Sequence, residues 1–219
     1  MLLKFVPKQK GYEHVTLQDI ADACGLTRGA IYHHFKGKVE MIDAVTDYMF
    51  NAATFYQDIK VDASLNGLEK LRRLFVASMT DDEHIKMYAM LSQTFYKSPK
   101  LVSAYLLDCQ NSVIPITQEY IEEGIADGSI KGDSSEYLAE IVMVFTNLWL
   151  SPLVFKTTKE KLLLRVKYTK IMLESIGLPL INDEVILAIE QFYKQCLCAT
   201  NCNSSSDRCN RAVGQKNLL

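Results

Sequence analysis

Residues 16–38, TLQDIADACGLTRGAIYHHFKGK, constrain the fold more than any other stretch of this 219-residue chain. Thr16 predicts the start of a short helix, because threonine is a good N-cap and Asp19 can complete a capping box with it. Gly25 predicts the end of that helix, since glycine adopts the left-handed conformation at little cost. The apolar residues that share one predicted buried face are Leu17, Ile20, Ala21 and Cys24.

A second short helix is predicted after Thr27, which can cap it, and Leu26 is expected to enter the core between the two helices. Ile31 and Phe35 point inward at i and i+4, and Gly37 predicts the end of the helix. The residues expected to face outward are Arg28, Gly29, Tyr32, His33 and Lys36. Two helices with a buried seam and an exposed second helix form a helix-turn-helix. On periodicity alone, an ordinary helical hairpin in an all-α protein fits equally well.

The stretch resembles the DNA-binding motif of the TetR family of bacterial transcriptional regulators. The segments that carry the resemblance are Thr16, 19–21 (DIA), 25–27 (GLT), 30–35 (AIYHHF) and Lys38. The resemblance implies an all-α protein with an N-terminal three-helix DNA-binding domain that contains a helix-turn-helix. It also implies a larger helical domain for ligand binding and dimerisation.

If this motif docks in the major groove, its residues divide into two groups. Those that can touch phosphates are Thr16, Thr27, Tyr32 and Lys38. Those that approach base edges are Arg28, Gly29, Ala30 and His34, and His33 completes the predicted DNA-binding set. Arg28 suits guanine and the methyl group of Ala30 suits thymine.

The rest of the sequence predicts further helices and no strand with strict alternation. The expected helices cover residues 39–57, 65–79, 82–96, 101–127, 136–155, 159–175 and 182–197. Pro115 should bend the long fourth one, because proline removes a helical hydrogen bond. The expected domains are 1–47 for DNA binding, 48–197 for effector binding and dimerisation, and 198–219 as a tail whose composition predicts disorder.

The N-terminal segment departs from the family pattern. Members of the family begin with a full helix before the segment that matches Gly11, but only ten residues precede Gly11 here, and Pro7 falls where a core aromatic is usual. The first helix is therefore expected to be short, broken or absent. This leaves open an alternative function: a dimeric module that binds a small molecule or a protein and has lost DNA binding.

The later part resembles a subset of the same family through EYIEEGIADGSIK, WLSPLVF and ESIGLPLIND. The resemblance implies that this domain binds an inducer and forms a homodimer through a four-helix bundle. Helix 136–155 is more apolar than one inward face requires, so we expect Phe145 and Trp149 in the seam between subunits. The alternative is that its apolar residues all face one intramolecular core.

Aromatic and methionine side chains on the helices that enclose the ligand pocket in the family suit a small hydrophobic or aromatic effector. The predicted pocket residues are Phe75, Met79, Met87, Met90, Phe95, Tyr96, Tyr105 and Tyr120. Packing in an ordinary core is the alternative for most of them.

Charge is distributed unevenly along the chain. The net charge is −2, but residues 1–38 carry six basic and three acidic side chains, which leaves −5 for the remainder. A basic head on an acidic body fits a protein that touches phosphate at one end.

No enzymatic or metal-binding motif is found in the sequence, so no catalytic residue, metal or cofactor is expected. It contains no glycine-rich phosphate loop, G-x-S-x-G or H-E-x-x-H. His33 and His34 are adjacent and point about 100° apart on a helix. The clustered cysteines are Cys196, Cys198, Cys202 and Cys209, whose spacing lacks the paired C-x2-C of zinc sites.

The longest apolar run, 141–155, is interrupted by polar residues, and the N-terminus is too short for a signal peptide, so a cytoplasmic location is expected.

Overall fold

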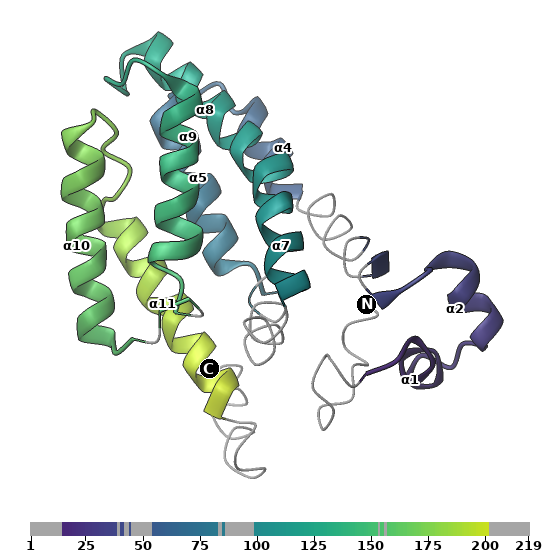
Figure 1. Ribbon diagram of the computed structural model, residues 1–219. Helices are drawn as coiled ribbons and strands as arrows, with labels where there is room; N and C mark the ends of the chain where they lie inside the picture. The colour runs from purple at the N-terminus through teal and green to yellow at the C-terminus, as the bar shows by residue number, and fades with distance from the viewer. Residues whose placement is uncertain are drawn as a thin grey trace, which may run out of the picture.

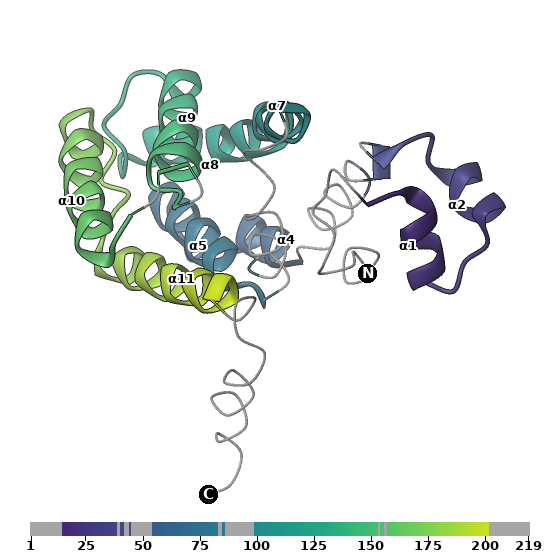
Figure 2. The same cartoon turned by 60° about the horizontal axis from the view of Figure 1, so that its bottom comes forward.

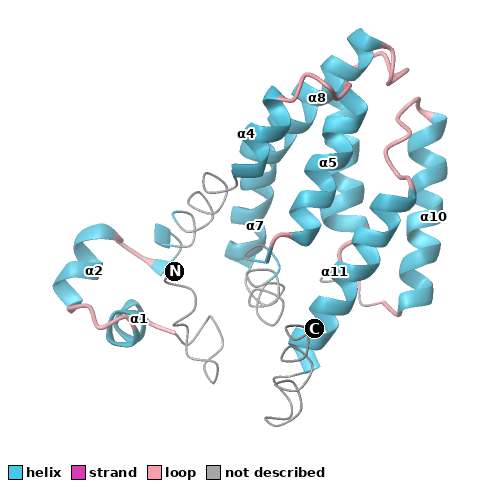
Figure 3. Cartoon of the chain, turned by 180° about the vertical axis from the view of Figure 1, so that it is seen from behind, coloured by secondary structure: helices cyan, strands magenta, loops and turns pink. Residues whose placement is uncertain are grey.

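A computed structural model describes residues 15–38, 40–41, 44, 54–82, 85, 99–152, 154–155 and 157–201. Within these ranges all regular structure is helical and there is no strand (Figure 3), which confirms the all-α fold class. Residues 1–14, most of the predicted helices 39–57 and 82–96, and residues 202–219 lie outside the described residues.

The helices fall into a small N-terminal pair and a larger body (Figure 1). In chain order they are α1 (Leu17–Ala23), α2 (Arg28–His34), α4 (Thr54–Val61), α5 (Gly67–Thr80), α7 (Pro99–Asp108), η4 (Cys109–Val113), α8 (Ile114–Asp127), α9 (Ser135–Met143), η5 (Val144–Trp149), α10 (Lys159–Ser175) and α11 (Asp183–Asn201). The pair has a hydrophobic cluster of its own, separate from that of the body.

Helix α8 lies at the centre of the body and packs against both α5 and α9. Helix α11 lies against α5 and α10 (Figure 2). Tyr120 and Ile121 of α8 and Leu173 of α10 are completely buried in the shared core. The crossing of α5 and α8 is very close at Gly67, where a Cβ atom would lie 2.1 Å from the backbone nitrogen of Gly124. Glycine is therefore required at this crossing.

The helix predicted over residues 101–127 is observed as three consecutive segments. α7 passes into the π-helical segment η4, and α8 then continues with Pro115 in its first turn. Pro115, where the sequence predicts a bend, thus directly follows a π-helical segment, and π-bulges and prolines are both recognised causes of helix bending.

Two predicted helix ends need correction. Helix α9 passes into the π-helical η5 and ends at Trp149, not at Phe155, because Ser151 accepts turn hydrogen bonds from the amides of Val154 and Phe155. The last helix continues past residue 197 to Asn201, so residues 198–201, assigned to the disordered tail, are helical.

Candidate nucleic-acid interface

The start of α1 is closed by a complete capping box. The Asp19 amide donates to Thr16 Oγ1 at 3.0 Å, and the Thr16 amide donates to Asp19 Oδ2 at 2.8 Å. Below this cap, the cluster that holds the helix pair together consists of Val15, Leu17, Ile20, Ala21, Ile31 and Met41, with Cys24 and Phe35 packed against it. The predicted buried face is present, and it fixes α2 against α1.

The turn between the helices follows the predicted glycine geometry. Gly25 has φ 67°, and the Leu26 amide donates to the Ala21 carbonyl at 2.8 Å. The expectation that Leu26 enters the core is wrong, since its side chain is 44% exposed. Ile20 and Ile31 are already buried in the seam, and the bond to Ala21 holds Leu26 in the turn.

Helix α2 begins where the sequence predicts and ends earlier. Thr27 Oγ1 accepts from the Ala30 amide at 3.2 Å and caps the helix. Ile31 is 2% exposed and anchors α2 in the pair. The helix stops at His34 instead of Gly37, because the backbone of Phe35 is extended and its half-buried ring packs against the pair's cluster.

The outward face of α2 carries the predicted DNA-binding side chains. Arg28, Gly29, Ala30, Tyr32, His33 and His34 are all exposed, as are Thr16 and Thr27, and Lys38 is half-buried. The guanidinium carbon of Arg28 lies 5.3 Å from the centre of the Tyr32 ring. A Cβ at Gly29 would meet nothing within 4 Å, so the backbone there is open to approach.

This face is chemically suited to DNA. It offers a guanidinium, a phenol and two imidazoles, and the sequence of α2 contains no carboxylate that would repel phosphate. Donors of this kind bind phosphate oxygens and the edges of guanine.

The residues predicted to line an effector pocket have different surroundings. Phe75 and Met79 of α5 are half-buried, with Phe75 beside the main core and Met79 beside Ile85 and Phe192. Tyr120 is 0% exposed in the core. Met87, Met90, Phe95 and Tyr96 lie outside the described residues.

Tyr105, the remaining predicted pocket residue within the described ranges, lies on α7 and makes a hydrogen bond to η5. Its hydroxyl donates to Asn147 Oδ1 at 3.0 Å, and Asn147 Nδ2 donates in turn to Thr146 Oγ1 at 3.0 Å. A separate depression of about 410 Å³ is lined by residues of α7 and η4, from Pro99 to Gln110.

The two residues predicted for the dimer seam are half-buried against the body. Phe145 and Trp149 both pack on the main core. The Trp149 ring lies 5.4 Å from the Phe155 ring, and the Arg165 guanidinium lies 5.4 Å from its centre. The indole nitrogen of Trp149 is buried and has no hydrogen-bond partner among the described residues.

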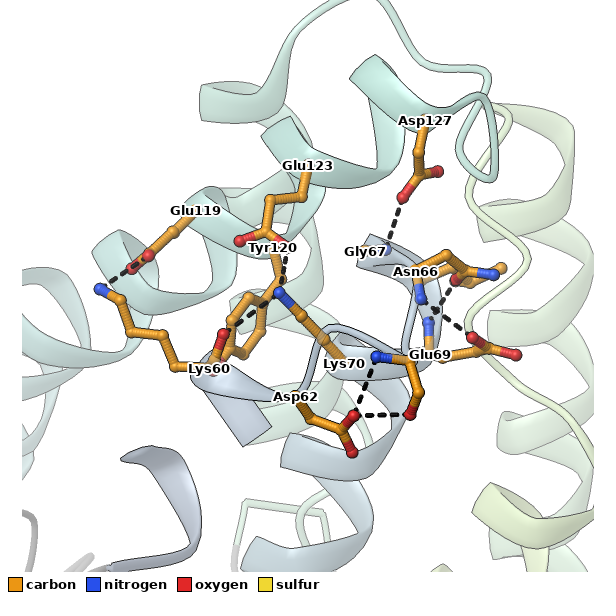
Figure 4. A network of polar contacts seen from close by, with 12 residues as sticks. Lys60, Asp62, Asn66, Gly67, Glu69, Lys70, Glu119, Tyr120, Glu123 and Asp127 are labelled. Atoms are coloured by element: carbon orange, nitrogen blue, oxygen red, sulfur yellow. Dashed lines mark hydrogen bonds and ion pairs between the residues drawn. The ribbon is translucent and has the colours of Figure 1, made fainter. Parts of the chain in front are cut away.

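Sequence reasoning missed a row of carboxylates on α8 (Figure 4). Glu119, Glu123 and Asp127 follow one another at intervals of four residues, so they lie on one face of the helix. Glu119 pairs with Lys60 of α4, Glu123 pairs with Lys70 of α5, and Asp127 Oδ2 accepts from the Gly67 amide at 2.7 Å. The spacing was visible in EYIEEGIAD, but their partners lie more than fifty residues away in the sequence.

The described ranges hold neither a metal-binding cluster nor a membrane-spanning helix. No three His, Cys, Asp or Glu side chains are grouped there in a way that could hold a metal ion. No described helix has the length and apolar character needed to cross a membrane.

A capped helix pair with a buried seam and an exposed second helix defines the helix-turn-helix class. Residues 7–45 match the family model described as bacterial regulatory proteins of the tetR family. The N-terminal segment is therefore similar to the DNA-binding part of TetR-family regulators.

Curated relatives agree with this assignment. The HTH-type transcriptional repressor KstR2 of Mycobacterium tuberculosis is 32% identical over 133 residues, which cover 57% of this chain and 64% of the relative. The match thus spans less than two thirds of that relative's length. The biofilm operon icaADBC HTH-type negative transcriptional regulator IcaR of Staphylococcus aureus is 23% identical over 145 residues, covering 64% of this chain and 74% of the relative.

A solved structure from Rhodococcus sp., assigned to the TetR-family transcriptional regulators, superimposes with a TM-score of 0.53. It is 17% identical in sequence, and the match covers 80% of this chain and 96% of that chain. At this identity the likeness concerns the fold alone.

Proposed function

We propose that the protein is a DNA-binding transcriptional repressor that acts as a homodimer on a pseudo-palindromic operator and is released by a small hydrophobic or aromatic molecule. The observation that carries the proposal is the outward face of α2, where Arg28, Tyr32 and His34 are exposed on a helix whose other side is anchored by Ile31. The names of the relatives, two repressors or negative regulators of transcription, support repression over activation.

The surface of α10 supports a homodimer. One stripe of this helix is buried in the subunit and includes Leu162, Val166, Thr169 and Leu173. A second stripe is exposed and consists of Leu164, Tyr168, Ile171 and Met172, which are 55%, 59%, 50% and 36% exposed. A helix that is apolar on two sides needs a second partner, and a second copy of this chain supplies the same stripe. Trp149 contacts this helix through Arg165, whose guanidinium lies 5.4 Å from the centre of the Trp149 ring, and both Phe145 and Trp149 pack on the main core of the subunit.

An effector would bind in the body. Tyr105 and Asn147 offer hydroxyl and amide groups beside two π-helical segments, which occur often at functional sites. Phe75 and Met79, together with the predicted pocket residues outside the described ranges, would supply apolar contacts. Release requires that the effector bind the DNA-competent form less tightly, and operator DNA must then weaken effector binding by the same factor.

The second candidate, a dimeric binding module without DNA binding, depends on the N-terminal segment before Val15, which lies outside the described residues. The exposed donors of α2 favour the regulator, because a module without DNA contacts would not need them.

Selection from a library of random DNA duplexes tests the proposal directly. The full chain is expected to enrich an inverted repeat whose half-sites are about one helical turn apart, or a multiple of it. A triple variant, Arg28→Ala with Tyr32→Ala and His34→Ala, is expected to enrich no sequence while keeping its fold by circular dichroism. Failure of the wild-type chain to enrich any sequence would support the binding module instead.

A further inference from the structure

Helix α4 is the part of the body nearest to the DNA-binding pair in the chain, and α8 holds it by one carboxylate. Tyr56 Oη donates to Glu119 Oε2 at 3.1 Å. Lys60 Nζ lies 2.7 Å from Glu119 Oε1 (Figure 4). Tyr56 and Lys60 are four residues apart, so they share one face of α4. Both oxygens of Glu119 are thus used to hold that face.

The C-terminal end of α4 is held by a second cation. Lys70 Nζ of α5 donates to the Lys60 carbonyl oxygen at 3.2 Å and pairs with Glu123 Oε2 at 2.6 Å. The Lys60 carbonyl is in the last turn of α4, where helical carbonyls lack an intrahelical partner. Lys70 is only 8% exposed, so this contact is shielded from water.

Apolar contacts set how deeply α4 sits in the body. Ile59 is 7% exposed in the main core, and the Tyr56 ring lies 6.1 Å from that of Tyr120 on α8. Ile59 and the Tyr56 ring anchor this side of α4, and Lys70 holds its last turn. The two contacts to Glu119 add a polar restraint on rotation or tilt of α4 about these anchors.

The Glu119 contacts are better suited to positioning α4 than to stabilising the fold. The side chains of Lys60 and Glu119 are 43% and 36% exposed, and exposed ion pairs contribute little to stability. The Lys60 hydrogen bond lowers the pKa of Glu119 from its ordinary value, so the carboxylate is charged at neutral pH.

Along the chain, residues 45–53 join Ala44, which follows the DNA-binding pair, to Thr54 at the start of α4. The position of α4 therefore sets the point at which the DNA-binding helix pair of each subunit is joined to the body. We propose that Glu119 is a positioning residue for DNA recognition: by holding Tyr56 and Lys60 it sets the placement of α4, and thereby the separation of the two α2 helices in the homodimer. This inference rests on the proposed function.

The test uses duplexes that carry two inverted copies of the half-site selected by the wild-type chain, with the spacer changed one base pair at a time. Wild type should prefer one spacing sharply. Glu119→Ala should bind a single half-site with an affinity within about twofold of wild type. The ratio of its affinity for the best spacing to its affinity for the neighbouring spacings should fall at least about fivefold. The reason is that a dimer whose α4 helices are not held firmly can bind half-sites at several spacings.

Two further variants separate positioning from a general loss of structure. Glu122→Gln removes a carboxylate from the same helix, but its partners are Gln118 and Ser135, so it should keep the wild-type spacing preference. Glu119→Lys should lose the preference, and the double variant Glu119→Lys with Lys60→Glu should regain most of it because the ion pair is restored in reverse.

The outcomes are distinguishable. An unchanged spacing preference in Glu119→Ala, or equal losses on single and paired half-sites, overturns the inference and leaves the proposed function intact. A wild-type chain that selects no inverted repeat overturns both.

Discussion

The ammonium nitrogen of Lys70 lies 2.6 Å from Glu123 Oε2, and only 8% of the lysine is exposed. Glu123→Gln leaves this ammonium almost buried without a carboxylate, so the free energy of unfolding should fall by about 1–3 kcal/mol. Lys70→Met should cost less, because Glu123 is 38% exposed and can be solvated by water. Urea unfolding at neutral pH measures both, and equal losses would contradict this explanation.

A methyl group at Gly67 should destabilise the body. The new Cβ would lie 2.1 Å from the Gly124 nitrogen and 2.5 Å from the Tyr120 carbonyl oxygen, which are backbone atoms that cannot move aside alone. We expect Gly67→Ala to lower the free energy of unfolding by about 2–3 kcal/mol.

Gly29 offers the matched control, since a Cβ there meets nothing within 4 Å. Gly29→Ala should raise the stability of α2 by up to about 1 kcal/mol. Thermal unfolding that shows the same shift for both variants would rule out a close crossing of α5 and α8.

Arg28 and Lys38 should differ in their effects on DNA binding. Lys38→Ala should weaken binding to all sequences about equally and reduce the salt slope by about one unit, as expected for a phosphate contact. Arg28→Ala should cost about 1–3 kcal/mol and relax the preference at one base position. Titrations of specific and scrambled duplexes at several salt concentrations measure both effects, and equal sequence-independent losses would contradict the division of roles.

Cys109 should resist modification in the folded protein. Its side chain is 0% exposed, and burial raises the pKa of its thiol to about 11. Alkylation by iodoacetamide at about pH 8 should therefore spare Cys109 until the chain is unfolded, because the thiolate is the reactive form. Peptide mapping by mass spectrometry reports the modification site.

The same shift affects stability at high pH. The folded state holds the Cys109 proton more tightly, so its contribution is complete below the ordinary thiol pKa and is lost as the pH rises toward about 11. Cys109→Ala should remove this part of the pH dependence of urea unfolding.

The exposed stripe of α10 should control assembly. Tyr168 is 59% exposed, so Tyr168→Glu should leave the fold intact and yield a monomer in sedimentation velocity at micromolar concentration. Trp149→Glu should also lower the melting temperature, because its ring packs against Phe155 and Arg165. A dimer in Tyr168→Glu would show that subunits associate through another surface.

Local signals allowed the helix-turn-helix to be predicted in detail. The caps at Thr16 and Thr27 and the left-handed turn at Gly25 depend on residues at most three positions away. The prediction that Leu26 is buried is wrong because its burial depends on the space between the two helices, which apolar periodicity does not report.

The body was predicted less well because its decisive contacts join distant residues. The Lys70–Glu123 pair spans 53 positions, and the Gly67–Asp127 hydrogen bond spans 60. The π-helical segments were also missed, since an extra residue within a helical turn leaves no mark in an apolar pattern read at 3.6 residues per turn.

The carboxylate row on α8 has a consequence for how the body opens. Glu119 holds α4, Glu123 neutralises the cation beneath it, and Asp127 accepts a hydrogen bond from the first residue of α5. Local unfolding of α8 would release all three contacts together. The backbone amides of α4, α5 and α8 should therefore exchange with solvent deuterium as a single cooperative unit, and an effector that loosened α8 would change the DNA-binding end of the chain without touching it.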